Sequence, residues 1–319
     1  MKPVLGALCV LSLCVSARAA AAELDVQWSD GAANCVGGPH PPIQVHQYDA
    51  QTYILRQNLC STFEAPFIYL LVGSSRALLI DTGAVEDPAK MPVAETVLGL
   101  LANVPLLVVH THRHGDHRAG DAQFANKPNV QVVSAFLEDV QKYFGFTKWP
   151  EGVAQIDLGD RTVDVIPTPG HDPTHVAFYD RNTSLFFSGD FFLPGRLLVD
   201  DTDEYVTSAI RVAEFVKDRP VSYVLGAHIE MNRAGELFEW ESTHHPDERD
   251  LPLTKEQLLA LPDTLRSFNG FYSKHGMFEM QNAMHILMAL GTAVLLGIIG
   301  LVWLTWRYFR RRRRRAATP

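Results

Sequence analysis

The feature that most constrains this chain is a six-residue run that begins at His112 and ends at His117. It follows the apolar stretch Leu106 to Val109 and holds four side chains that bind metals well: His112, His114, Asp116 and His117. Neutral imidazole and carboxylate suit zinc, and a catalytic zinc typically has three protein ligands and one open position. A short loop can point His112 and His114 at one ion while Asp116 and His117 turn to a second. We therefore expect a strand that ends in a loop holding two cations.

The ligands that each ion still needs are expected from three later positions, each at the end of an apolar stretch. His171 follows the strand-like run Val163 to Ile166, and Asp190 closes a second apolar run. His228 comes directly after Tyr223 to Ala227. Each of the three lies where a strand is expected to give way to a loop.

These positions belong to five motifs that occur in the same order in a known family. The motifs are Leu79-Ile80-Asp81-Thr82-Gly83, the six-residue run, Gly170-His171, Ser188-Gly189-Asp190 and Gly226-Ala227-His228. In this set the chain resembles the metallo-β-lactamase superfamily of hydrolases, over roughly Phe67 to Met231. The resemblance implies an α/β fold, the metallo-β-lactamase αββα sandwich, in which outer helices cover two sheets and the ligands gather at one sheet edge.

The resemblance also implies a role for each candidate ligand. The first metal would be held by His112, His114 and His171, the second by Asp116, His117 and His228, and Asp190 would bridge the two. Asp81 matches the family's carboxylate that steadies a ligand imidazole from behind. Asp116 and Asp190 are the expected catalytic residues. The expected cofactor is two zinc ions per chain, with iron or manganese as alternatives.

Other polar residues near the motifs have two interpretations each. His110 lies two positions before His112, on the same side of a strand, and we expect a packed strand histidine rather than a further site residue. His175 lies in the loop after His171 and contacts either substrate or solvent. The remaining candidates for substrate contact, with ordinary loop surface as the alternative, are Glu230, His244 and His245.

The two ends of the chain differ from its middle. Lys2 precedes the apolar run Val4 to Val15, and Ser16-Ala17-Arg18-Ala19 is typical of a signal-peptide cleavage site. We divide the chain into a signal peptide (residues 1–19), an N-terminal extension (20–66), a catalytic core (67–231), a C-terminal helical and loop segment (232–284), a transmembrane helix (285–306) and a basic cytoplasmic tail (307–319).

The transmembrane prediction depends on an uncharged run near the C-terminus. Ile286 to Trp306 contains no charged residue and would span about 30 Å as a helix, close to the hydrocarbon thickness of a bilayer. The arginines Arg310 to Arg315 mark the cytoplasmic side, so a single-pass protein with an extracytoplasmic catalytic domain is expected, periplasmic in a bacterium. A homodimer or a lipid-facing stripe would explain the small residues Ala289, Ala293 and Gly297.

The net charge bears on the class of substrate, and the cysteines bear on the compartment. Setting aside the basic residues of the signal and the tail leaves 19 basic against 36 acidic residues, a net charge of −17. Such a domain repels polyanions, which argues against nucleic-acid substrates. Cys35 and Cys60 remain after signal removal; in an oxidising compartment they form either a disulfide or two free thiols.

The middle of the chain alternates strand and helix patterns. Strands are predicted over residues 68–72, 77–80, 106–109, 130–133, 158–166, 176–187 with a turn at 180–182, and 223–225. Helices are predicted over 93–101, 136–144 and 204–217, and a capping box at Thr254 and Gln257 predicts a helix through 258–261.

These patterns predict a hydrolase in which a metal-activated hydroxide attacks a carbonyl carbon of a small-molecule substrate. Asp190 favours a glyoxalase-II-like or lactonase-like enzyme over a β-lactam hydrolase, since β-lactam-cleaving relatives generally carry cysteine or serine near that position. A second hypothesis is an iron persulfide-dioxygenase-like oxidoreductase, whose single iron would use His112, His171 and Asp190. A membrane-tethered binding module without catalysis is the third.

Overall fold

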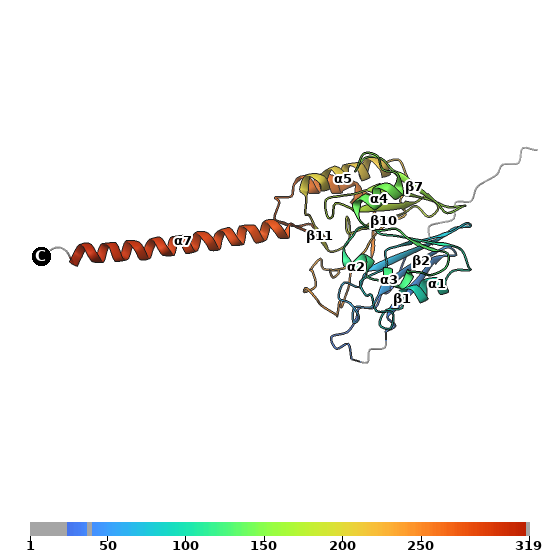
Figure 1. The fold of residues 1–319 in the computed structure, drawn as a ribbon, viewed down its shortest axis with the longest axis horizontal. Coiled ribbons are helices and arrows are strands. Elements are labelled where there is room, and N and C mark those ends of the chain that lie inside the picture. Colours follow the sequence, from blue (N-terminus) through green and yellow to red (C-terminus); the bar gives the residue numbers. More distant parts are fainter. Residues whose placement is uncertain (1–23, 37–39, 317–319) are drawn as a thin grey trace, which may run out of the picture.

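The structure is a computed structural model that describes residues 24–36 and 40–316. Figure 1 shows two layers of strands with helices on their outer sides, and one long helix, α7, that leaves them. The signal peptide predicted for residues 1–19 lies outside the described residues.

The first sheet has six strands in the order β1-β2-β3-β4-β5-β6. They are β1 Ile43–Asp49, β2 Thr52–Gln57, β3 Phe67–Val72, β4 Ala77–Ile80, β5 Leu106–Val109 and β6 Val130–Val132. The predicted hairpin between β3 and β4 is present. The segment predicted as an N-terminal extension supplies two strands of this sheet, β1 and β2. The strand β2 pairs with β3, and its side chains Ile54 and Leu55 are fully buried.

The second sheet has the order β13-β12-β10-β9-β8-β7. Its strands are β7 Ala154–Asp157, β8 Thr162–Pro167, β9 Val176–Asp180, β10 Leu185–Gly189, β12 Tyr223–Gly226 and β13 Pro252–Leu253. The strand predicted over 158–166 is confirmed as β8 for residues 162–166, but its first four residues form a turn instead. A turn separates β7 from β8, because Gly159 has a φ of 105° and its N–H donates to Asp157 Oδ1 at 2.8 Å.

The two sheets pack face to face, and helices cover their outer faces. Between the sheets, Tyr69 of β3 lies against Phe187 of β10, with ring centroids 4.6 Å apart. Apolar side chains of α1 and α3 pack on the first sheet, and those of α5 and α6 pack on the second. The helices are α1 Val93–Gly99, α2 Gly115–Arg118, α3 Asp121–Phe124, α4 Leu137–Phe144, α5 Thr202–Val216 and α6 Lys255–Arg266. The αββα sandwich is therefore confirmed, as is the capping box at the start of α6.

The long helix α7 Ala283–Ala316 is joined to the sandwich by a small third sheet. This sheet has the order β11-β15-β14, from β11 Arg196–Leu198, β14 Tyr272–Lys274 and β15 Glu279–Gln281. Asn282 alone separates β15 from α7; it is buried, its Nδ2 donates to Asp200 O at 3.3 Å, and its Oδ1 accepts from the His285 N–H at 2.9 Å. The helix therefore begins on an ordered part of the domain.

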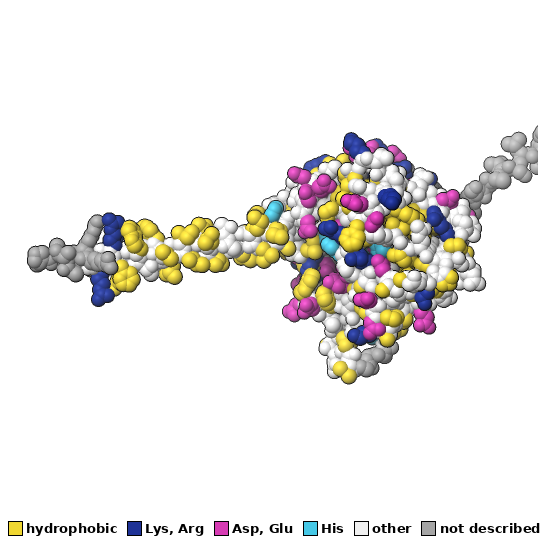
Figure 2. All heavy atoms as spheres, in the orientation of Figure 1, with side chains coloured by type: hydrophobic (Ala, Val, Ile, Leu, Met, Phe, Trp, Pro, Cys, Tyr) yellow, Lys and Arg dark blue, Asp and Glu magenta, His cyan; other side chains and the backbone are white. Residues whose placement is uncertain are grey.

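By length and composition, α7 can cross a membrane over Ala283–Arg312. No part of its apolar stretch is buried against the rest of the chain, and Figure 2 shows apolar side chains all along it. The helix is thus a candidate membrane anchor, and it contains the predicted span 285–306.

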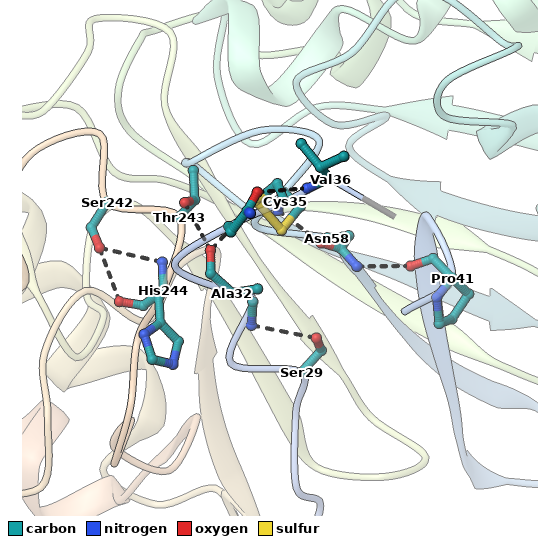
Figure 3. The surroundings of a disulfide bond; sticks show 12 residues. Ser29, Ala32, Cys35, Val36, Pro41, Asn58, Ser242, Thr243 and His244 are labelled. Carbon is teal, nitrogen blue, oxygen red and sulfur yellow. Dashed lines mark hydrogen bonds between the residues drawn. A yellow bond between two sulfur atoms is a disulfide. The ribbon is translucent and has the colours of Figure 1, made fainter. Parts of the chain in front are cut away.

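A disulfide joins Cys35 to Cys60, with Cα atoms 5.2 Å apart, so the bonded alternative is confirmed. It ties the segment before β1 to the loop between β2 and β3. Figure 3 shows that the same N-terminal segment also contacts a later loop, since Ala32 accepts from Thr243 Oγ1 at 3.1 Å and its N–H donates to Thr243 O at 3.0 Å. Three segments distant in sequence are held together at this point.

Candidate metal centre

The loops that carry the predicted ligands follow the C-terminal ends of β5, β8, β10 and β12. These loops converge, and the seven side chains gather in two groups whose ligand atoms lie within 4.8 Å of one another inside each group. The first group is His112, His114 and His171, and the second is Asp116, His117, Asp190 and His228. The partition follows the one that the sequence motifs imply.

The first group consists of three imidazoles that face a common point. His114 Nδ1 lies 2.8 Å from His112 Nε2 and 3.2 Å from His171 Nε2. The far nitrogen of His171 donates to the Leu198 carbonyl oxygen at 3.1 Å, which leaves Nε2 unprotonated and directed at the centre. His112 and His171 are buried, whereas His114 is partly exposed.

The second group combines imidazoles with carboxylates. Asp116 Oδ2 lies 3.1 Å from His117 Nε2 and 3.3 Å from His228 Nε2. His228 Nδ1 donates to the Glu64 carbonyl oxygen at 2.7 Å, so that its Nε2 is also free to bind a cation. The carbonyl of Glu64 comes from the β2–β3 loop that the disulfide restrains.

Asp190 lies between the two groups. Its Oδ2 is 3.5 Å from His171 Nε2 in the first group and 3.3 Å from His117 Nε2 in the second. Its Oδ1 is 3.5 Å from His228 Nε2. A single carboxylate thus faces both groups, as a bridging ligand must.

Two observations test whether these residues fit metal ions. In the described part of the chain, six buried side-chain atoms have no hydrogen-bond partner, and three of them, His117 Nε2, Asp190 Oδ1 and His228 Nε2, point into this centre. Ligands about 2.1 Å from a tetrahedral ion lie about 3.4 Å from each other, close to the separations of 3.1 to 3.5 Å in the second group. Nitrogen and oxygen donors held at this spacing without hydrogen bonds fit a divalent metal.

The charges of the two groups differ. Burial, followed by the neighbouring histidines, lowers the pKa of His112 well below its usual value, so this imidazole is neutral and ready to ligate. Burial also opposes protonation of His228, but Asp190 and Asp116 outweigh it and raise the pKa of His228 to about 10. In the second group the proton on His228 therefore offsets part of the negative charge of the two carboxylates. A bound cation would replace this proton.

Two buried aspartates support the ligands from behind. Asp81 Oδ2 lies 2.9 Å from His117 Nδ1, and both of its oxygens accept from Thr111, from the N–H at 2.7 Å and from the hydroxyl at 2.9 Å. Asp81 thus occupies the position that the resemblance implies, and it has a positive φ of 68°. Asp172, which the sequence analysis did not single out, lies 3.6 Å from His114 Nε2 and accepts from Arg113 Nε at 2.9 Å.

Neither interpretation of His175 describes its position. The side chain is fully buried, so it faces neither solvent nor substrate. Its Nε2 accepts from the Asp190 N–H at 3.2 Å, and its Nδ1 donates to Thr168 Oγ1 at 2.7 Å. Burial lowers the pKa of His175 to about 3, which keeps it neutral for this role. His110 is a packed, buried histidine, as predicted, but it lies directly after β5 rather than in the strand; its ring is bonded to Val133 O at 3.1 Å and Asp121 Oδ1 at 2.8 Å.

A cavity of about 200 Å³ opens onto both groups. Of the predicted substrate contacts, Glu230 lines it, and its Oε2 accepts from the Arg196 N–H at 2.6 Å. Five further residues that line the cavity belong to no recognisable motif and were not predicted: Glu64, Leu193, Arg196, Leu198 and Trp240. Burial raises the pKa of Glu64.

The other two predicted contacts do not line this cavity. His245 is buried and stacks on Phe238, with ring centroids 4.0 Å apart, and its Nδ1 is 3.1 Å from Glu248 Oε1. His244 pairs with Gly31 in an isolated bridge, and its side chain points toward Asp30 at 3.9 Å. His244 thus contacts the N-terminal segment, whereas His245 lines a second pocket that shares Glu64, Arg196, Glu230 and Trp240 with the metal cavity.

Comparison with known proteins supports the same assignment. Residues 61–228, more than half of the chain, match the metallo-beta-lactamase superfamily. The chain belongs to this superfamily. The match covers all seven ligands of the candidate centre, together with Asp81 and Asp172.

Named relatives of this superfamily hydrolase include an acyl-coenzyme A thioesterase and a hydroxyacylglutathione hydrolase. The chain is 29% identical to the acyl-coenzyme A thioesterase MBLAC2 of Gallus gallus over 215 residues, which cover 56% of this chain and 77% of that protein. It is 30% identical to the hydroxyacylglutathione hydrolase of Nostoc punctiforme over 127 residues, or 40% of this chain and 48% of that enzyme. Among solved structures, a metallo-beta-lactamase from Pontibacter korlensis has a TM-score of 0.47 and 17% identity, covering 71% of this chain and all of that one.

Proposed function

We propose that this protein is a membrane-anchored, extracytoplasmic dinuclear zinc hydrolase that cleaves a carbonyl substrate, with thioesters favoured over lactones and related esters or amides. The observation that carries the proposal is the position of Asp190, whose carboxylate faces both ligand groups. Two zinc ions bound there would supply Lewis acidity and lower the pKa of water enough to provide hydroxide near neutral pH.

The side chains of the centre have separate tasks in this reaction. Asp116 lines the cavity, where its carboxylate is positioned to accept a hydrogen bond from the attacking water and to receive its proton. Asp81 and the Glu64 carbonyl hold His117 and His228 in the orientation that directs Nε2 inward. Within the described residues that line the cavity no serine or cysteine is present, which favours direct attack by water over a covalent intermediate.

Two lines of support favour a thioester. The resemblance implies that an aspartate at position 190 favours thioester and lactone substrates over β-lactams. The relatives named above, an acyl-coenzyme A thioesterase and a hydroxyacylglutathione hydrolase, are named for thioester substrates. A β-lactam remains the alternative substrate to be assayed.

The proposed location depends on the two ends of the chain. The helix α7, followed by the arginine-rich tail, would anchor the protein with its C-terminus in the cytoplasm. The Cys35–Cys60 disulfide agrees with an oxidising compartment for the catalytic domain. The net charge of the domain argues against a nucleic-acid partner. We also propose that the protein forms a homodimer through Ala289, Ala293 and Gly297 of α7. Crosslinking of the protein in its membrane that gives monomer alone would remove the dimer.

One experiment tests the catalytic proposal. The full-length protein is purified from its native membrane, its metal content is measured, and thioester, lactone, β-lactam and phosphodiester substrates are assayed side by side. About two zinc ions per chain with thioester cleavage is the expected result. One iron per chain with persulfide oxidation would replace the proposal with the oxygenase, and two zinc ions with β-lactam cleavage alone would replace the substrate class.

A further inference from the structure

A large aromatic side chain stands exposed at the edge of the metal cavity. Trp240 lines the cavity together with Asp116 and His228, and 60% of its surface is exposed. Its ring lies 5.5 Å from that of Phe63, centroid to centroid, at an interplanar angle of 58°. We call Trp240 and Phe63 the aromatic wall; Trp240 lines the metal cavity, and both residues line the second pocket that shares Trp240 with it. Phe63 comes from the β2–β3 loop, and Trp240 lies beyond the residues that match the superfamily.

The surroundings of the wall favour an apolar occupant. Leu193 and Leu198 line the same cavity, so it offers further apolar surface besides Trp240. The cation beside the wall is Arg196, whose guanidinium carbon lies 5.8 Å from the centroid of the Trp240 ring. A free guanidinium would attract an anion, so its partners decide what the wall can bind.

The guanidinium of Arg196 is already occupied. Its Nη1 lies 3.4 Å from Glu230 Oε1, and its Nη2 donates to the Phe238 carbonyl oxygen. The carboxylate of Glu230 balances its charge, and Glu64 adds a further acidic group to the cavity. An anionic substrate group would have to displace Glu230, whereas an apolar group needs only to cover Trp240, Leu193 and Leu198.

The aromatic wall is held in place from both sides. The disulfide at Cys60 anchors the loop that carries Phe63. The loop that carries Trp240 is joined to the N-terminal segment by the bonds between Ala32 and Thr243, and by the His245 N–H, which donates to Asp30 O at 2.8 Å. Figure 3 shows these segments side by side around the disulfide. A wall braced in this way is pre-organised, so little ordering is needed when a substrate binds.

We propose that the aromatic wall is a binding subsite for the apolar acyl group of the substrate, and that it selects medium-length acyl chains over acetyl. The proposal rests on the proposed function, since the acyl group is the part of a thioester next to the attacked carbonyl. Each methylene that leaves water for the wall should raise kcat/KM by about fourfold, up to the length at which the wall is filled.

The test compares acyl chain lengths on a neutral leaving group. The full-length protein in lipid nanodiscs is assayed with acetyl, butanoyl, hexanoyl and octanoyl thioesters of N-acetylcysteamine, with empty nanodiscs as the blank. In the wild type kcat/KM should rise with chain length. Trp240→Ala should lose at least tenfold with octanoyl, mainly through KM, and less than twofold with acetyl. Trp240→Phe should retain most of the preference.

Phe136→Ala is the matched control, because Phe136 is an aromatic residue 54% exposed that does not line the cavity. It should leave the chain-length profile unchanged. An unchanged octanoyl-to-acetyl ratio in Trp240→Ala would overturn the aromatic wall while leaving thioester hydrolysis intact.

If the wild type cleaves none of the thioesters, the proposed substrate class fails, and binding then tests the wall separately. Calorimetry with the non-hydrolysable octyl and ethyl thioethers of N-acetylcysteamine should show tighter binding of the octyl compound, and this preference should vanish in Trp240→Ala. Equal affinities of the wild type for the two thioethers would reject the subsite.

Discussion

The two ligand groups of the centre present similar nitrogen atoms to a metal but differ in charge. The first group has three imidazoles, and burial lowers the pKa of His112 and His114. The second group has two carboxylates, which raise the pKa of His228 to about 10. A divalent ion in the second group would have the carboxylate of Asp116 in addition to its share of Asp190, whereas an ion in the first would have its share of Asp190 alone. The second group should therefore bind its metal more tightly.

The carboxylates behind the ligand histidines also favour tighter metal binding in the second group. His117 in the second group rests on Asp81, a buried carboxylate 2.9 Å away that two hydrogen bonds from Thr111 fix in place. His114 in the first group has Asp172 at 3.6 Å, and that carboxylate is shared with Arg113. A carboxylate behind an imidazole makes it a stronger ligand, and a neighbouring guanidinium weakens that effect. Four predictions follow from this difference, from the largest expected effect to the smallest.

Removing the carboxylate that the groups share should have the largest effect. Asp190→Ala should lower kcat by roughly a thousandfold or more, because several kcal/mol of stabilisation by the metals depends on both being in place. Circular dichroism should show an intact fold, since the Asp190 side chain lies at the cavity rather than in the apolar core. Activity close to that of the wild type, on any substrate that the wild type cleaves, would contradict the bridging role.

Removing the metals should show that the two groups differ in metal affinity. Chelator titration followed by metal analysis should release the ions in two steps, and the metal-free chain should be less stable by about 4 kcal/mol if the free metal had been a thousandfold above its Kd. His114→Ala and His228→Ala form a matched pair, each lacking one ligand of one group. His114→Ala should keep the tightly held ion and His228→Ala the weakly held one. Equal release from both variants would show that the groups do not differ.

The sequence predicted the centre better than its surroundings, for a physical reason. Ligands such as His171 and His228 end apolar strands, so periodicity and motif order locate them without knowledge of packing. Asp172 and Glu64 act through positions that depend on how loops meet: Asp172 reaches a histidine 58 residues earlier in the chain, and Glu64 offers only its backbone carbonyl to His228. No local pattern encodes such contacts.

The same reasoning explains the errors on either side of the core. His244 and His245 share composition with ligand loops, but their loop pairs with Gly31 and Asp30, more than 200 residues earlier in the chain, and no local pattern encodes such a contact. In the N-terminal extension, by contrast, the alternation of Ile43 and Val45 with polar residues is a local signal that indicates β1. Trp240 carries no such signal, because a lone tryptophan in a polar stretch is equally typical of a surface loop.

Removing the carboxylates behind the ligand histidines should have a smaller effect on metal affinity, and this effect should differ between the two groups. Asp81→Ala should weaken metal binding in the second group by about 10–100-fold, and Asp172→Ala should weaken it less, in the first group only. Competition with a chromophoric chelator measures both affinities in each variant. A larger loss from Asp172→Ala than from Asp81→Ala would reverse the proposed order of the two groups.

The smallest effect is expected from a residue that touches both groups without being a ligand. His175 stacks on His112, with ring centroids 5.1 Å apart, and accepts the backbone N–H of Asp190. Loss of that hydrogen bond costs about 1 kcal/mol, so His175→Ala should lower kcat by about fivefold and leave KM unchanged. His175→Gln, which can still accept the hydrogen bond, should recover part of the loss.

His110→Ala is the control for this prediction, because His110 is also a buried histidine with two hydrogen bonds but none to a ligand. It should reduce stability without changing kcat. If both alanine variants lower kcat equally, His175 acts only through packing. If only His175→Ala does so, and the metal content of both variants is normal, then the backbone of Asp190 must be held for its carboxylate to serve the two groups at once.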